Sequence, residues 1–141
     1  YVKKFLSEVS VRYDAENDWP IIRYADVLLM YAEVLNEVDG PSAGLKYLNL
    51  VRERAGLSKI ESDAVTTRNV FRTYLEKERR LELAFENHRW FDLIRTGRAV
   101  EVMRSKGFSL NETNLICPIP QKQIDVNPKL TQNDYRIESR N

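Results

Sequence analysis

Three carboxylates recur at every fourth position of one segment: Glu78, Glu82 and Glu86. In a helix this spacing places them on one face, where each pair of like charges costs roughly 0.2–0.5 kcal/mol. Paired carboxylates are the catalytic groups of glycosidases, which hold them on opposite sides of a glycosidic bond. Side chains one turn apart on one helix project side by side instead. The spacing therefore argues against glycoside hydrolysis.

The glutamates instead predict a structural ion-pair network with basic side chains of the next segment, where Arg89, Arg95 and Arg98 are the nearest candidates. A buried, paired Glu82 would make Glu82→Ala cost about 3–5 kcal/mol. A loss below about 0.5 kcal/mol would place Glu82 on an exposed face. The predicted network consists of Glu78, Glu82, Glu86, Arg89, Asp92 and Arg95.

The other reactive side chains lack the partners that a catalytic or metal site needs. His88 is the only histidine, so zinc and di-iron motifs with two histidines are excluded, and a helix-boundary role is favoured. Cys117 is the only cysteine, which excludes a disulfide within the chain, and beside Pro118 we expect it to pack as a small hydrophobe. The five glycines are too dispersed for a phosphate-binding loop. We expect no catalytic residue, metal site or cofactor.

Aromatic side chains are weighed separately because sugars often stack on them. Trp19 precedes Pro20 at a helix entrance and is a weak candidate for ligand binding, although a packing role is favoured. Trp90 falls on the apolar face of a predicted helix, together with Phe91, Leu93 and Ile94, and we expect this face to be buried.

Length and composition indicate one globular domain. The chain has 141 residues, a hydrophobic fraction of 43% and a net charge of +1. This charge gives no reason to expect a nucleic-acid partner. The longest apolar run, residues 27–32, is far shorter than a membrane span. The chain opens at Tyr1 without a signal segment, so we expect it to be a piece of a longer protein.

The helix predicted after Pro20 has two apolar faces, which implies two packing neighbours. Gly40 and Pro41 are expected to end it and to start a second, antiparallel helix, which stops at Gly56. The small residue Gly44 is expected where the helices cross closely, opposite Ala32. The first face carries Tyr24, Val27, Tyr31 and Val34, and the second Ile22, Ala25, Leu29 and Ala32.

The predicted fold is mainly α, with two antiparallel helical hairpins of tetratricopeptide-like type and an irregular C-terminal strap. Residues 1–20 form a lead-in with a weak strand signal at 9–13, 21–56 the first hairpin, 57–67 a polar connector, 68–104 the second hairpin and 105–141 an irregular tail. Within 68–104, a helix from Arg68 to Glu86 ends at Asn87, and another begins near His88 and breaks near Gly97.

Three passages of the sequence share the order and wording of one known family. They are 19–37, with Trp19-Pro20-Ile21-Ile22-Arg23-Tyr24-Ala25-Asp26; 78–95, with Glu78-Arg79-Arg80-Leu81-Glu82 and Arg89-Trp90-Phe91-Asp92-Leu93; and 118–133, with Pro118-Ile119-Pro120 and Leu130-Thr131-Gln132-Asn133. Together they resemble the C-terminal part of the SusD/RagB family of nutrient-binding outer-membrane lipoproteins. Two positions depart from the family pattern: Asn87 stands where glycine is usual, and Asp134 where Pro-Gly follows the last Gln-Asn.

The resemblance implies a non-catalytic glycan- or nutrient-binding protein on the bacterial cell surface, active in polysaccharide utilization. It also implies a lipid anchor on an N-terminal cysteine absent from this chain, and a SusC-like TonB-dependent outer-membrane transporter as partner. In the family, the main sugar contacts come from segments upstream of this one, so this segment resembles scaffold and its ligand-binding residues stay open. The alternative function is a helical-repeat adaptor that binds a protein partner.

Overall fold

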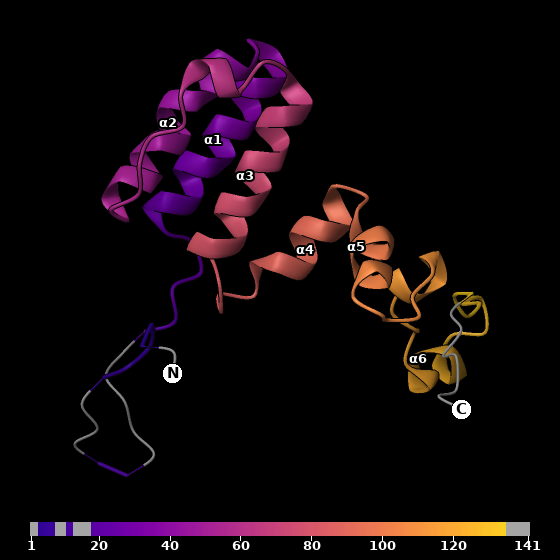
Figure 1. The fold of residues 1–141 in the computed structure, drawn as a ribbon. Helices are drawn as coiled ribbons and strands as arrows, with labels where there is room; N and C mark the ends of the chain where they lie inside the picture. The colour runs from indigo at the N-terminus through magenta and orange to yellow at the C-terminus, as the bar shows by residue number, and fades with distance from the viewer. Residues whose placement is uncertain (1–2, 8–10, 13–17, 135–141) are drawn as a thin grey trace. The chain divides into compact units, whose positions relative to one another are not determined.

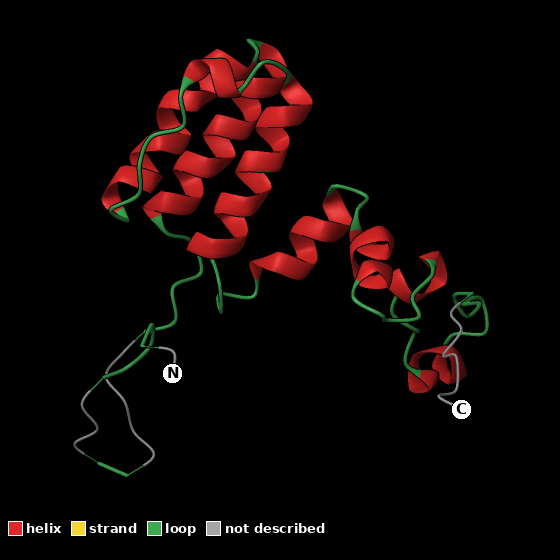
Figure 2. Cartoon of the chain, in the orientation of Figure 1, coloured by secondary structure: helices red, strands yellow, loops and turns green. Residues whose placement is uncertain are grey.

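A computed structural model describes residues 3–7, 11–12 and 18–134, and every regular element in these ranges is helical (Figure 2). This confirms the mainly α prediction, while the tetratricopeptide-like detail stays a prediction. The strand signal at 9–13 falls mostly outside the described residues. The chain divides into two compact units, Tyr1–Arg89 and Trp90–Asn141, which are described separately. The elements are α1 (Tyr24–Val38), α2 (Pro41–Arg54), η1 (Ser62–Ala64), α3 (Arg68–Glu82), α4 (His88–Arg95), α5 (Ala99–Ser105), η2 (Glu112–Leu115) and α6 (Gln121–Val126).

In the first unit, α1, α2 and α3 lie side by side and each helix contacts the other two (Figure 1). The turn between α1 and α2 follows the prediction. Gly40 has a φ of 99°, in the left-handed region that glycine adopts without strain, and Pro41 is the first residue of α2. Gly56, with a φ of 75°, follows the end of α2 in the same way.

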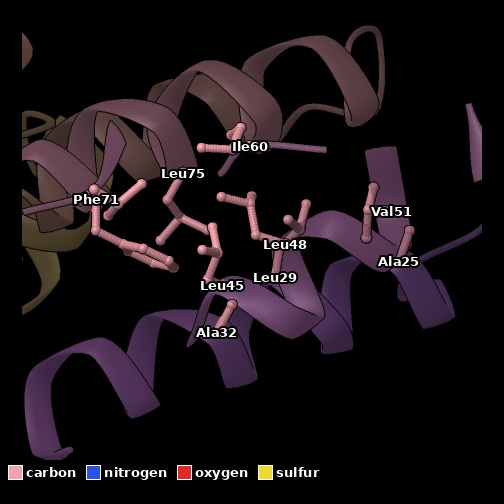
Figure 3. Packing of buried hydrophobic residues seen from close by; sticks show 10 residues of the cluster. Ala25, Leu29, Ala32, Leu45, Leu48, Val51, Ile60, Phe71 and Leu75 are labelled. Carbon is pink, nitrogen blue, oxygen red and sulfur yellow. The ribbon is translucent and has the colours of Figure 1, made fainter. Parts of the chain in front are cut away.

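The core of this unit is formed by apolar side chains that point toward one another from the three helices and from the connector between α2 and α3 (Figure 3). Each fully buried Leu or Phe stabilises the fold by about 1.5–3 kcal/mol. Gly44 sits at the closest approach, since an added Cβ would lie 2.5 Å from the Ala32 carbonyl oxygen and 2.8 Å from the Phe71 ring. This confirms the predicted close crossing of Ala32 and Gly44. The core residues are Ala25, Leu29, Ala32, Leu45, Leu48, Val51, Ile60, Val65, Phe71 and Leu75.

The connector between α2 and α3 is more deeply packed than its polar composition predicted. Ile60 and Val65 are both buried. The buried Asn49 side chain donates to the Ile60 carbonyl oxygen at 3.0 Å and accepts from the Ile60 amide at 2.9 Å. These two bonds fix the connector against α2. A side-chain amide that binds backbone eleven residues later leaves no periodic signal in the sequence, so the prediction missed it.

The third helix ends four residues earlier than predicted, at Glu82 instead of Glu86. Asn87 does adopt the predicted left-handed conformation, with a φ of 63°, but Phe85 is also left-handed, at 67°. A non-glycine residue in this region costs of order 1–3 kcal/mol and persists only when surrounding contacts hold it. The tight reversal removes Glu86 from the helix and lets its carboxylate meet other parts of the unit.

In the second unit, Gly97 has a φ of 69° at the predicted break between α4 and α5. Leu93 is buried as expected, but Trp90 and Phe91 are exposed, so the prediction of a fully buried apolar face on α4 was wrong. The predicted second hairpin, 68–104, spans both units, and its packing stays a prediction.

The tail predicted to be irregular contains two short helices, η2 and α6. Helix α6 begins directly after Pro120, which is its N-cap residue and has an extended ψ of 132°. The Gln132 side chain accepts from the Ile119 amide at 2.8 Å and donates to its carbonyl at 2.9 Å, while Asn133 donates to the Cys117 carbonyl at 2.7 Å. These side-chain amides close the 117–133 loop and give the Gln-Asn pair of the third passage a structural role.

Candidate functional site

The three glutamates singled out by the sequence each meet basic side chains. Glu78 Oε2 lies 2.8 Å from Arg52 Nη1 of α2. The Glu82 carboxylate lies between Arg23 at 3.0 Å and Arg54 at 2.6 Å. Both glutamate side chains are less than a tenth exposed. These contacts tie the C-terminal half of α3 to the N-terminus of α1 and to the end of α2.

Glu86 completes this cluster from the turn after α3. Arg23 Nε donates to Glu86 Oε2 at 2.8 Å, and Lys4 forms a second ion pair with the same carboxylate. Burial is the largest single influence on the pKa of Glu86 and raises it, but hydrogen bonds and charges from Arg23 and Lys4 together outweigh it. The pKa of Glu86 therefore lies below its ordinary value. The hydrogen bond that Arg23 donates to the Glu86 carboxylate is the largest influence on the pKa of Arg23 and raises it above its ordinary value.

Lys4 and Asp26 extend the cluster at its two sides. Lys4 Nζ also donates to the carbonyl oxygens of Glu82 at 2.7 Å and Ala84 at 2.9 Å, which holds the turn after α3 to the lead-in. Asp26 of α1 pairs with Arg79 of α3 at 2.8 Å, and both side chains are buried. The charges thus form a network that connects helices, and their polar atoms are engaged with one another.

The basic partners come mostly from parts of the sequence that the prediction did not choose. The structure pairs Arg89 with Glu76, Arg95 with Asp92 and Arg98 with Glu101. The partners of Glu78, Glu82 and Glu86 lie in α1, α2 and the lead-in instead. Proximity in sequence pointed to the next segment, whereas the bundle brings together residues up to 82 positions apart. The missed signal was the polar edge of α1, where Arg23 and Asp26 are three residues apart on one face.

The remaining candidates lie outside this network. Trp19 is 52% exposed, and its ring stacks on Phe5 with centroids 4.7 Å apart and planes at 23°, so Phe5 covers one ring face. His88 is the first residue of α4, as its predicted boundary role requires. Cys117 is exposed, so the prediction that it packs as a small hydrophobe was wrong.

A shallow depression of about 400 Å³ lies between α1 and α2, with mainly apolar walls. Over the part of the chain that the structure describes, no group of His, Cys, Asp and Glu side chains is arranged to hold a metal ion. The helices described there are all too short or too polar to cross a bilayer. The depression is lined by Arg23, Tyr24, Ala25, Leu28, Leu50, Val51 and Arg54.

A sequence profile described as the SusD family matches residues 1–135. The chain belongs to the SusD family. It is 36% identical over 119 residues to SusD-like protein P38 of Formosa agariphila, covering 80% of this chain and 24% of the relative. It is 35% identical over 133 residues to SusD-like protein P25 of the same organism, covering 89% and 25%.

Solved SusD superfamily structures agree with the fold. A Bacteroides vulgatus protein aligns with a TM-score of 0.71 and 30% identity over 81% of this chain and 27% of its own. One from Bacteroides thetaiotaomicron aligns with a TM-score of 0.64 and 27% identity over 81% and 25%. This SusD-family chain therefore spans about a quarter of the length of the relatives it matches.

Proposed function

We propose that residues 1–141 are scaffold in a cell-surface protein that binds a glycan or another nutrient for uptake across the outer membrane. Membership of the SusD family supports this, because SusD-like proteins generally bind glycans at the outer membrane. The proposal includes a non-catalytic role, an N-terminal lipid anchor and delivery of the ligand to a SusC-like TonB-dependent transporter.

The observation that favours a scaffold role is the use made of the charged residues. Arg23 forms ion pairs with both Glu82 and Glu86, which joins the start of α1 to the end of α3 and to the turn after it. A ligand site needs donors and acceptors that point into a cavity, because only such groups can replace the water around sugar hydroxyls. In this network the charged side chains bind one another and hold the helices together, so they do not point into a cavity as ligand-binding groups would.

The experiment is a binding screen of polysaccharides and oligosaccharides against two polypeptides side by side: the full-length protein that contains this segment, and residues 1–141 alone. We expect binding by the full-length protein and none by the segment. A Trp19→Ala variant of the full-length protein is included, because the free face of the Trp19 ring is the weak ligand candidate of this segment.

The outcomes separate the parts of the proposal. Binding of a glycan by residues 1–141 alone, or loss of glycan binding by the full-length Trp19→Ala variant, would overturn the scaffold role. If the full-length protein bound no glycan, glycans would be excluded as the ligand, and the ligand would belong to another class of nutrient. Capture of a protein partner through this segment, without binding of any small ligand, would favour the adaptor alternative.

A further inference from the structure

The chain enters and leaves the bundle of α1, α2 and α3 at the same end (Figure 1). The first turn of α1 lies beside the last turn of α3, since Asp26 pairs with Arg79 at 2.8 Å. The last turn of α1 lies beside the first turn of α3, since Arg68 Nε donates to the Asn36 carbonyl oxygen at 2.9 Å. These two helices are therefore antiparallel, and the lead-in before α1 meets the turn after α3, residues 84–87.

A lysine of the lead-in, Lys4, ties these two segments together. Its ammonium group donates to the carbonyl oxygens of Glu82 and Ala84, and it forms an ion pair with the Glu86 carboxylate. Arg23, at the start of α1, pairs with the same carboxylate. The Lys4 side chain is 29% exposed and that of Glu86 only 1%, so water reaches this ion pair from one side alone. We name Lys4, Arg23 and Glu86 the latch.

The turn that the latch holds has a backbone conformation that its own residues disfavour. Phe85 and Asn87 have φ values of 67° and 63°. A residue with a Cβ is strained in this left-handed region and stays there only where surrounding contacts hold it. Among the described residues the Phe85 ring is 64% exposed, so burial of the ring does not supply these contacts. The polar contacts of the latch are therefore the main ones that hold the turn.

We propose that the latch is a conformational device: when it is broken, the lead-in segment 3–7 and the turn 84–87 open together while the bundle stays folded. The apolar core that holds the bundle is formed by residues between Ala25 and Leu75, and it lies outside both segments. A segment held by a few polar contacts near solvent opens at a lower free energy than one held by a buried core. This inference does not depend on which ligand the protein binds.

The test is amide hydrogen exchange of the full-length protein, measured by mass spectrometry on peptides that cover residues 84–87. Lys4→Met removes the ammonium group and keeps an unbranched side chain. The matched control is Lys59→Met, which removes the exposed ion pair of Lys59 with Glu53. We expect Lys4→Met to speed exchange of the turn at least about tenfold, because its charged contacts to this segment are lost. Peptides from the core of α1 and α2 should stay within about twofold of the wild type, and Lys59→Met should change neither region.

A second variant tests whether the latch holds a strained backbone. Phe85→Gly places at a φ of 67° the one residue type that adopts this conformation without strain. The double variant Lys4→Met/Phe85→Gly should therefore protect the turn at least about threefold better than Lys4→Met alone, after correction for the intrinsic exchange rates of the two sequences.

Three results would overturn the inference. Equal exchange of the turn in Lys4→Met and in the wild type would show that Lys4 does not hold it. Equal acceleration in the turn and in the core of α1 and α2 would show that the turn and the bundle open as one unit. Protection in the double variant no better than in Lys4→Met alone would show that the latch does not hold a strained backbone.

Discussion

Asp26 of α1 and Arg79 of α3 form an ion pair that is buried at both ends, and Asp26→Ala tests whether it fixes these helices together. The atoms Asp26 Oδ1 and Arg79 Nη1 are 2.8 Å apart, and the side chains are 5% and 6% exposed. Removing one partner of a buried pair costs about 3–5 kcal/mol, because the other charge loses its closest counter-charge in a site with little water. The free energy of unfolding of a domain is typically only about 5–15 kcal/mol, so a loss of this size for Asp26→Ala should be easy to measure.

Two further variants separate charge from packing. Asp26→Asn keeps an acceptor for Arg79 but removes the charge, and it should cost about 1–2 kcal/mol, since a hydrogen bond between neutral and charged groups is weaker than one between two charges. The double variant Asp26→Leu/Arg79→Met should recover most of the loss, because apolar replacements of a buried pair are often neutral or stabilising.

The assay is equilibrium urea unfolding of each variant, followed by far-ultraviolet circular dichroism. The matched control is Arg72→Ala, which removes the exposed ion pair of Glu37 with Arg72 between the same two helices and leaves the hydrogen bond from Asn36 to Glu37 in place. Water and salt screen that ion pair, so the unfolding midpoint of Arg72→Ala should stay within error of the wild type. A loss below about 1 kcal/mol for Asp26→Ala, or one no larger than for Arg72→Ala, would refute a buried pair at this site.

Three other perturbations follow from the same packing. Glu82→Ala should lower the free energy of unfolding, measured in urea, by about 2–3 kcal/mol. This loss is smaller than the roughly 3–5 kcal/mol expected for breaking a buried pair, because Arg23 keeps its ion pair with Glu86. Because the pKa of Glu86 is lowered on folding, its contribution to stability is present above its ordinary pKa of 4.5 and is lost as the pH falls through the lower folded value. Unfolding midpoints measured from pH 7 down to pH 3 should show this loss of stability, and the loss should be smaller in the Glu86→Gln variant. Gly44→Ala should lower the melting temperature: the contact with Phe71 forces overpacking that costs about 1–3 kcal/mol and outweighs the gain in helix propensity of about 1 kcal/mol.

Each of these expectations has a clear contrary result. A loss below about 0.5 kcal/mol for Glu82→Ala would place that carboxylate on an exposed face. Identical pH profiles for wild type and Glu86→Gln would mean that Glu86 has the same pKa in the folded and unfolded chains. A higher melting temperature for Gly44→Ala would show that α1 and α2 are further apart than the structure places them.

The helices of the first unit were predictable from local signals. Gly40 and Gly56 mark helix ends because few other residues adopt a left-handed backbone without strain, and Pro41 marks a start because its φ is fixed. The two apolar faces of α1 were also visible from their period. The early end of α3 was not, because Phe85 in a left-handed conformation contradicts its own preference.

The acidic half of the ion network was visible in the sequence, and most of its basic half was not. Repeated glutamates on one helix face require cations, so the need for partners could be inferred. Which arginines provide them depends on the order in which helices pack, and Lys4 and Arg52 are far from α3 in sequence. Pairing across a bundle is a tertiary property that a single sequence does not encode in any local period.

The measurement that tests the central claim most directly is the Kd of the full-length protein for a glycan found in the screen, with and without Trp19→Ala. The account predicts a Kd within about twofold of the wild type, because a scaffold segment makes no ligand contact with a substantial share of the binding energy. An increase of more than tenfold, or about 1.4 kcal/mol, at unchanged stability would contradict it and place part of the ligand site in this segment.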